Sequence, residues 1–230
     1  MPAKIIEIDG IGAVHFYKRR AARSIRLSIT HQGQIRVSLP FWVPFAAGVS
    51  FVQSKKDWIN TERPETTILT EGYRLGKAHH ITFLAGSGDN ITTRISGNEA
   101  RVMLPVGLKW DNPDVQAAAQ NVAIRVLKKE ARMILPPRLK SLAQQHGFTY
   151  RSVSVKQLTG RWGSCSSEKD IVLNCFLMQL PLELIDYVLL HELTHTNVMA
   201  HGPIFWNEMR RVLPDVDVRR KQIKQHKPVL

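Results

Sequence analysis

The sequence lacks any apolar run long enough to cross a membrane, and its first residues, MPAKIIEIDG, lack the basic and then apolar layout of a signal peptide. Cysteine is nearly absent: Cys165 and Cys175 lie ten residues apart, outside any CxxC pair. We therefore expect a cytoplasmic protein with two free thiols, not a secreted disulfide scaffold. Internal repeats and low-complexity segments are also absent.

Acidic residues are few compared with basic ones. The 19 Asp and Glu stand against 32 Lys and Arg, which gives a net charge of +13, spread as +6 over residues 1–111 and +7 over residues 112–230. Such a field attracts polyanions, so nucleic acid is a candidate partner, with the basic tail VRRKQIKQHKP as its most natural contact. No motif that combines aromatic and basic residues accompanies the charge, however. The alternative is a soluble basic protein without a polyanion partner.

The 230 residues, 43% of them hydrophobic, suit one large domain or two subdomains with a core. Residues 12–110 have mainly strand patterns. The alternation in RSIRLSIT and IRVSLP, separated by the turn HQGQ, predicts a hairpin with one apolar face. A short helix is predicted over residues 44–60. Further strands are expected at residues 81–84, 91–95 and 101–104.

The pattern becomes helical at DNPDVQ, where Asn112 can cap a helix with Pro113 at its first position. The apolar positions at helical spacing are Val115, Ala119, Val122, Val126 and Met133. Pro136 and Pro137 predict a kink or break, with a second segment ending at Gly147. Two strands, over residues 153–158 and 171–177, then precede the helix PLELIDYVLLHELTHT. The sequence therefore predicts an α+β fold, with an N-terminal β-rich subdomain over residues 1–110 and a second subdomain over residues 111–230.

Three histidines and one glutamate lie within the eleven residues HELTHTNVMAH, 191–201. A helix advances about 100° per residue, so His191 and His195 lie one turn apart on one face, which Leu184 and Val188 continue toward the core. Glu192 lies within reach of a water held by both imidazoles. Two neutral imidazoles can bind zinc while the carboxylate takes a proton from the bound water, which is the physical content of HExxH. The alternative is a pair of surface or capping histidines near a helix end.

A catalytic zinc needs a third protein ligand and keeps one position open for water. We expect His201, because Gly202 and Pro203 favour a chain reversal before a new helix, PIFWNEMRRVL, and leave His201 free to point back. Glu208 on that helix is the rival. The spacing HExxHxxxxxH also matches the metzincin outline, but that motif requires glycine where Val198 stands, so we reject it.

Four segments carry a resemblance to a known family: RWGSCSS, IVLN, the helix that contains HELTH, and HGPIFW. Together they resemble the YgjP-like metallopeptidases, relatives of the SprT-like and Wss1-like zinc proteases. An ARSIRLSI-type strand at residues 22–29 extends the resemblance over most of the chain. The resemblance implies a zincin-like core of gluzincin type, arranged as helix, strand and HExxH helix. It also implies His191, His195 and His201 as zinc ligands and Glu192 as the catalytic base.

The segment RWGSCS joins the two predicted strands just before the catalytic helix, so it can line the cleft. Arg161 can hold a substrate carbonyl or phosphate, and Trp162 can form the floor of a pocket. The alternative is a tight turn in which Gly163 supplies backbone freedom. One of the two flanking strands is expected to be an edge strand to which an extended substrate pairs. Cys165 is either an inhibitory zinc ligand or a small buried thiol.

The sequence thus predicts a zinc-dependent peptidase acting on peptide or protein substrates. Glu192 takes a proton from a metal-activated water and passes it to the leaving amine. Tyr187, one turn before His191, is either the stabiliser of the tetrahedral intermediate or a core residue. The alternative function is a nucleic-acid-associated zinc protein, either non-catalytic or acting on DNA-bound proteins. We expect no membrane association.

Overall fold

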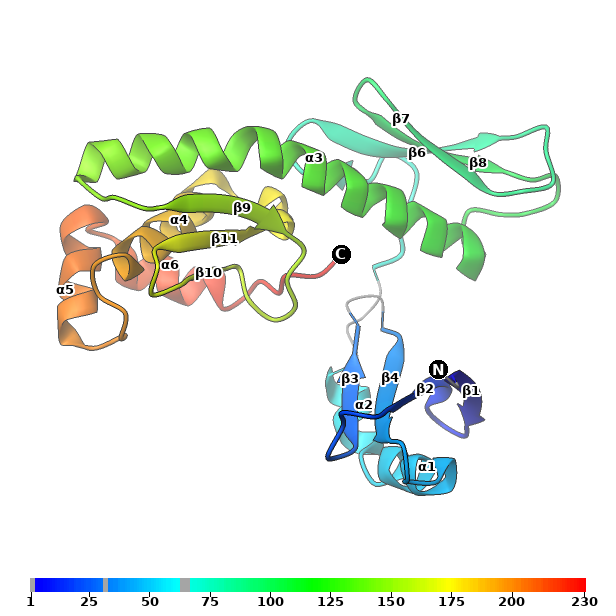
Figure 1. The fold of residues 1–230 in the computed structure, drawn as a ribbon. Coiled ribbons are helices and arrows are strands. Elements are labelled where there is room, and N and C mark those ends of the chain that lie inside the picture. The colour runs from blue at the N-terminus through cyan, green and yellow to red at the C-terminus, as the bar shows by residue number, and fades with distance from the viewer. Residues whose placement is uncertain (1–2, 31–32, 63–66) are drawn as a thin grey trace. The chain divides into compact units, whose positions relative to one another are not determined.

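A computed structural model describes residues 3–30, 33–62 and 67–230 (Figure 1). The chain forms two compact units, one of Met1–Thr67 with Val229–Leu230 and one of Ile68–Pro228. The described residues form three β-sheets and six α-helices, which confirms the predicted mixed α+β class. None of the helices in these residues combines the length and apolarity that crossing a membrane would need.

The first unit is a four-stranded sheet with two helices. Its elements are β1 (Ala3–Ile8), β2 (Gly12–Arg19), β3 (Arg26–Ile29), β4 (Ile35–Pro40), α1 (Phe45–Gln53) and α2 (Lys56–Glu62). The sheet order is β1-β2-β4-β3, with β2 and β4 parallel. The predicted hairpin is confirmed as the antiparallel pair β3–β4, and its turn lies partly outside the described residues. One face of the sheet forms the core, where Phe16, Val37 and Leu39 are fully buried. The single helix predicted over residues 44–60 is wrong, because two turn residues separate α1 from α2.

The second unit carries two sheets and the remaining helices. Its strands are β5 (Arg74–Leu75), β6 (His79–Ala85), β7 (Thr92–Ser96) and β8 (Glu99–Leu104) in the order β5-β6-β8-β7, and β9 (Ser152–Lys156), β10 (Gly163–Cys165) and β11 (Asp170–Asn174) in the order β10-β11-β9. Its helices are α3 (Pro113–His146), the 3-10 helix η1 (Cys175–Gln179), α4 (Leu182–His195), α5 (Pro203–Val212) and α6 (Val216–Ile223). The strands predicted at residues 81–84, 91–95 and 101–104 are confirmed as β6, β7 and β8.

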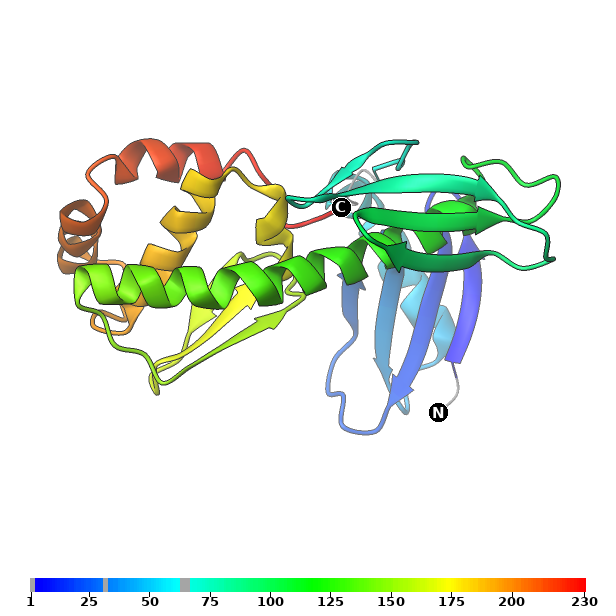
Figure 2. The same cartoon turned by 90° about the horizontal axis from the view of Figure 1, so that it is seen from above.

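Helix α3 joins the two sheets of the second unit. Figure 2 shows its first half along the sheet of β6, β7 and β8 and its second half beside β9, β11 and α4. Its buried face therefore changes along its length. Val122 and Val126 are buried upstream, whereas Leu135 and Leu139 are buried downstream. Met133, predicted as a core residue, continues the spacing of Val122 and Val126 but is 68% exposed, because the buried positions have moved to Leu135 and Leu139 there.

Of the kink or break predicted at Pro136 and Pro137, the break is wrong, since α3 continues through both prolines to His146. Each proline lacks the N–H that would bond the carbonyl four residues earlier. Those carbonyls belong to Arg132 and Met133, which are exposed, so water can replace the two missing hydrogen bonds. Gly147 ends the helix as predicted, in the left-handed conformation with φ 73°.

The boundary between the units differs from the predicted one at residues 110 and 111. It lies at residues 67 and 68, and the sheet of β5–β8 belongs with α3 in the second unit. Glu130 of α3 contributes to this association. Its buried carboxylate accepts hydrogen bonds from the backbone N–H groups of Lys77 (2.6 Å) and Ala78 (3.0 Å) and lies 2.6 Å from Nδ1 of His79. Contacts of this kind link residues about fifty positions apart, which a local pattern does not reveal.

Candidate metal centre

Helix α4 brings two histidines and a glutamate to one place. Its apolar face, with Leu184 and Val188 buried as predicted, packs into the core and ends at the first histidine. His191 and His195 are four residues apart, so both imidazoles leave the helix in the same direction. Their Nε2 atoms lie 3.2 Å apart. Helix α4 thus positions His191 and His195, two of the three predicted metal ligands.

His201 completes the group from the turn after α4. Gly202 is the N-cap of α5 and Pro203 its first residue, and the Gly202 N–H donates to the carbonyl of Ala200 at 2.8 Å. This reversal returns His201 toward α4. Its Nε2 lies 3.1 Å from Nε2 of His195 and 3.0 Å from Nε2 of His191. The three ring nitrogens converge and form a group that could hold a metal ion.

Neighbouring side chains fix the orientation of the three rings. Nδ1 of His195 lies 3.1 Å from the carbonyl of Val198, so a neutral His195 donates there and presents the Nε2 lone pair to the centre. Phe205 is fully buried, with its ring centroid 4.6–5.0 Å from those of all three imidazoles. Phe205 therefore supports the three imidazoles from the core side.

Trp206 holds the turn that carries His201. Its indole N–H donates to the carbonyl of His201 at 3.2 Å, and the guanidinium of Arg220 lies 4.0 Å from the centroid of its ring. Arg220 belongs to α6, which overlaps the basic tail VRRKQIKQHKP. The sequence reasoning missed the role of Trp206, although the residue stands within the quoted motif HGPIFW.

Burial keeps the imidazoles of His191 and His195 neutral. It lowers the pKa of His191 to about 3, assisted by the neighbouring His195 and His201, and it also lowers the pKa of His195. Nδ1 of His191 is buried without a hydrogen-bond partner among the described residues. Neutral imidazoles with converging lone pairs are the form in which histidine binds metal ions.

Glu192 lies beside this group and is buried. Burial raises the pKa of its carboxyl to about 8, and the positive charge of Arg161 opposes that rise. Its carboxylate faces Gly163 of β10: a Cβ atom on Gly163 would lie 2.6 Å from Oε1. Gly163 has no positive φ, so its glycine serves this close approach and not the turn geometry that the sequence suggested.

Strand β10 forms one edge of its sheet and borders the histidines. The pocket at the metal centre is lined by Gly163, Ser164, Cys165 and Met199 together with the HExxH residues and His201. Strand β10 pairs with β11 in an antiparallel ladder, and the residues on either side of β10 form hydrogen bonds toward β11. One of these runs from the N–H of Asn174 to the carbonyl of Trp162 (2.9 Å). The alternation then directs the N–H and C=O of Gly163 and Cys165 away from β11.

The edge strand next to the histidines is therefore β10, and the prediction that one of the two flanking strands has this position is wrong. β11, the second of those strands, is central in the sheet, and β9, the first, is at the opposite edge. Strand β10 has only three residues and lies in a segment with the composition of a turn. Its pattern is therefore too short to be recognised from the sequence.

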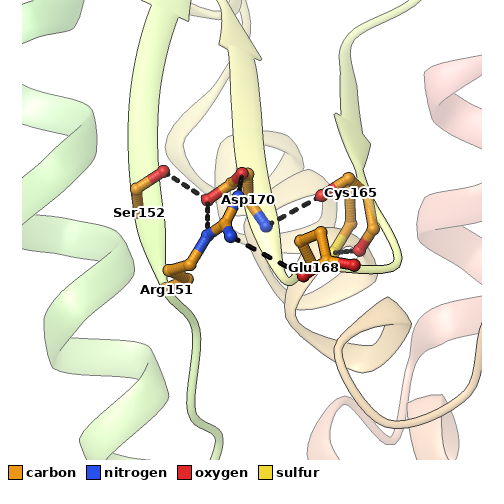
Figure 3. A network of polar contacts seen from close by, with 6 residues as sticks. Arg151, Ser152, Cys165, Glu168 and Asp170 are labelled. Atoms are coloured by element: carbon orange, nitrogen blue, oxygen red, sulfur yellow. Dashed lines mark hydrogen bonds and ion pairs between the residues drawn. The ribbon is translucent and has the colours of Figure 1, made fainter.

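Charged and polar residues connect the beginnings of β9 and β11 with the turn that follows β10 (Figure 3). Arg151 and Asp170 form a bidentate ion pair, in which Nε of Arg151 donates to Oδ1 of Asp170 at 2.8 Å. Ser152 donates a hydrogen bond to the same carboxylate at 2.7 Å. The backbone N–H of Asp170 donates to Oγ of Ser166 at 3.1 Å, and Arg151 lies 3.6 Å from Glu168. These contacts join β9, β11 and the turn that follows β10.

The loop before β10 depends on a buried asparagine. Asn174 is fully buried, and its side-chain amide donates to the carbonyls of Leu158 (3.0 Å) and Arg161 (2.8 Å). Arg161 and Trp162 lie at the start of this edge, outside the described residues that line the pocket. The side chain of Arg161 is exposed and that of Trp162 half-buried. Asn174 lies in the motif IVLN, but no local pattern indicates this role.

Three other candidates occupy definite places. Glu208 pairs with Arg211 on α5, with oxygen–nitrogen distances of 2.7 and 3.0 Å, and it stands apart from the histidine group. Tyr187 is 5% exposed and its ring centroid lies 6.0 Å from that of His191, as in a core residue. Cys165 is half-buried at the pocket, and its thiol contacts the carbonyl of Ser166 at 3.5 Å. Burial and the nearby Glu192 raise the pKa of Cys165 to about 11, so the thiol is protonated.

Comparison with known proteins gives the family. A family model described as YgjP-like, metallopeptidase domain, matches residues 23–226. Two solved structures are similar to part of the chain: the metallopeptidase zymogen abylysin of Pyrococcus abyssi (24% identity, 38% of this chain and 89% of that chain, TM-score 0.35) and the metallopeptidase zymogen jannalysin of Methanocaldococcus jannaschii (24% identity, 38% of this chain and 90% of that chain, TM-score 0.34). No curated protein matches the chain. The family match spans nearly the whole sequence, and the chain belongs to the YgjP-like metallopeptidase family.

Proposed function

We propose that this protein is a zinc-dependent peptidase whose metal ligands are His191, His195 and His201. The observation that carries the proposal is the convergence of three Nε2 atoms, all within 3.2 Å of one another. When all three rings carry their protons on Nδ1, their Nε2 lone pairs repel one another at this separation unless a cation lies between them. Membership of a metallopeptidase family supports the same conclusion.

The arrangement suits zinc. Tetrahedral zinc with bonds of about 2.05 Å to nitrogen separates its ligand nitrogens by roughly 3.3 Å. The separations here, 3.0–3.2 Å, are close to that value and need only a small outward movement of the rings. Three neutral imidazoles leave the fourth position free for water or substrate, as in catalytic zinc sites. The Glu208 carboxylate, which is paired with Arg211, is the weaker candidate for a third ligand.

When bound, zinc lowers the pKa of water and polarises the scissile carbonyl. The chain's own contribution begins with Glu192, whose buried carboxylate lies between the histidines and β10. A cation held by the three histidines would favour the ionised form of Glu192, against the protonated form that burial alone favours. We assign to this carboxylate the removal of a proton from the attacking water and its delivery to the leaving amine. Burial excludes bulk water from this carboxylate, so the proton is exchanged with the reacting groups.

The substrate is held by the edge of β10. The outward N–H and C=O groups of Gly163 and Cys165 can form a ladder with an extended peptide, which places its backbone next to Glu192. Arg161, exposed just before this edge, is placed to bind a carbonyl of the same peptide, and Trp162 to contact a side chain. An HExxH helix beside an edge strand is also the arrangement of the zincin class, in its gluzincin form, that we propose for this fold.

Substitution of Glu192 tests the proposal. Glu192→Gln keeps the size and burial of the side chain but removes the base, so zinc remains bound, measured by metal analysis, while cleavage of a casein or unstructured peptide substrate disappears. Glu183→Gln, an exposed change at the start of the same helix, serves as the matched control and retains cleavage. Full cleavage by Glu192→Gln would remove this residue from the mechanism.

The alternative, a nucleic-acid-associated zinc protein without peptidase activity, has one feature in its favour, the net charge of +13. It predicts that no protein substrate is cleaved by the zinc-loaded wild-type chain. Family membership favours the peptidase, and a nucleic-acid partner is compatible with either function.

A further inference from the structure

The first unit contains a long stretch without acidic residues. Between Asp9 and Asp57 the sequence has eight lysines and arginines and no aspartate or glutamate. This stretch includes β2, β3 and β4. Sheets usually mix both signs of charge on a solvent-facing surface, because opposite charges across strands stabilise each other. A surface of one sign that is formed by a folded sheet is therefore a candidate for binding a ligand of opposite charge.

The strand register brings the basic residues to one face. Ile35, Val37 and Leu39 of β4 point into the core, so Arg36 and Ser38 point to the other face. Ser38 is paired with Tyr17 on one side and with Arg26 on the other. This outer face, which we call the arginine face, consists of Tyr17, Arg19, Arg26, Ser28, Arg36 and Ser38. These six residues line a groove along the strands.

The arginines of this face are available for a ligand. Arg19, Arg26 and Arg36 are exposed, and in the described part of the chain none of the ion pairs involves them. Arg36 donates from Nε to the amide oxygen of Gln34 at 2.8 Å, which orients the guanidinium without neutralising it. A second hollow continues this groove at Arg23, in the loop between β2 and β3.

Two exposed aromatic residues stand in the turn that follows β4, beside one end of the arginine face. Phe41 and Trp42, 58% and 68% exposed, directly follow Pro40, which is the register partner of Arg19. The ammonium group of Lys18 donates to the carbonyl of Phe41 at 3.1 Å and so fixes this turn against β2. Exposed aromatic rings of this size are costly in water, and next to a basic groove they provide surfaces on which bases can stack.

We propose that the arginine face binds single-stranded nucleic acid. Phosphates lie along the groove against Arg19, Arg26 and Arg36, and unpaired bases stack on Phe41 and Trp42. A duplex keeps its bases stacked inside and has no use for the two exposed rings, so the combination of arginines with aromatics favours a single strand. The basic tail is the weaker candidate, because Arg219 is paired with Asp215 and Arg220 is stacked on Trp206.

Fluorescence anisotropy with a labelled oligothymidylate of about 20 nucleotides, longer than one typical binding site, tests this proposal on the full-length protein. The double variant Arg26→Ala/Arg36→Ala weakens binding at least tenfold and lowers the slope of log affinity against log salt by about 0.7 for each lost phosphate contact. Trp42→Ala weakens binding by roughly fivefold or more and leaves the salt slope unchanged, because stacking releases no counterions.

Matched variants separate the arginine face from charge in general. Lys221→Ala/Lys224→Ala removes the same charge from exposed positions in and after α6 and leaves binding nearly unchanged. Arg26→Lys/Arg36→Lys keeps the charge and retains the salt slope. Circular dichroism verifies that every variant is folded.

Three results would overturn the proposal. Equal losses in the alanine double variant and in its lysine-to-alanine counterpart would show that binding follows net charge alone. A duplex of the same length that binds as tightly as the single strand would remove the stacking role of Trp42. Binding to phosphatidylserine vesicles, abolished by the same arginine substitutions while the oligonucleotide is unaffected, would identify the face as a lipid-binding surface.

Discussion

A Cβ atom on Gly163 would lie 2.6 Å from Oε1 and 2.9 Å from Cγ of Glu192, so strand β10 and the HExxH helix meet at a point with room only for glycine. Real side chains essentially never approach that closely. The contact brings the backbone of the edge strand against the carboxylate that we propose as the base. A peptide paired with β10 would then lie within reach of both Glu192 and the three histidines.

The first prediction concerns this contact. Gly163→Ala forces the carboxylate of Glu192 away from its position, and a displacement of about 1 Å near the reacting atoms lowers kcat by roughly 100-fold. The three histidines are untouched, so metal content stays the same. Peptide cleavage assays combined with metal analysis check both results. Gly88→Ala, at a position where a Cβ would meet no atom within 4 Å, is the control and retains activity. Unchanged kcat in Gly163→Ala would mean that Glu192 is displaced without consequence.

The second prediction separates the two candidates for the third ligand. His201→Ala removes one of the three converging nitrogens. Loss of a residue that only supports a metal ligand lowers metal affinity by up to about 100-fold, so we expect loss of a ligand itself to lower zinc affinity by more than that. Glu208→Gln breaks only an exposed pair with Arg211 and leaves zinc affinity unchanged. Competition with a chelator of known affinity measures both. The opposite outcome, loss in the glutamate variant alone, would assign the third ligand to α5.

Local patterns were sufficient for part of this site. The spacing of His191 and His195 fixes their common face as soon as the segment is helical, and Gly202–Pro203 indicates the turn that returns His201. These are relations within eleven residues. The hairpin β3–β4 was likewise predictable because its alternation and its turn are adjacent in sequence.

Contacts between distant segments were not predictable in this way. Gly163 and Glu192 are 29 positions apart, and only the fold explains why the glycine is needed. Met133 has the spacing of a core residue but is exposed, because the buried positions of α3 have moved to Leu135 and Leu139 at that point. Pro136 and Pro137 stop a helix only where their missing hydrogen bonds cannot be replaced, which depends on exposure.

The third prediction concerns Asn174. Asn174→Ala removes the hydrogen bonds that this side chain makes with the carbonyls of Leu158 and Arg161 and with the N–H of Phe176. Each unsatisfied buried group costs about 1–3 kcal/mol, and partial rearrangement reduces the sum, so we expect the free energy of unfolding to fall by about 2–4 kcal/mol. Urea denaturation measures the change. Asn207→Ala, exposed on α5, changes it by less than about 0.5 kcal/mol. A loss no larger than in this control would contradict the role of Asn174.

The last prediction is the acid dependence of the ion-pair network in Figure 3. Hydrogen bonds from Arg151 and Ser152 lower the pKa of Asp170 from 3.8 to about 2 in the folded state. Because the folded pKa is the lower one, the stabilisation is complete above about pH 4 and is lost as the pH falls from about 4 to about 2. Asp170→Asn is therefore less stable than the wild type at pH 7, and the difference in urea midpoint between the two shrinks over that interval. Ser152→Ala, which removes one hydrogen bond and keeps the ion pair, shows a smaller difference over the same interval. A difference between Asp170→Asn and the wild type that stays constant down to pH 2 would mean that the carboxylate gains nothing from Arg151 on folding.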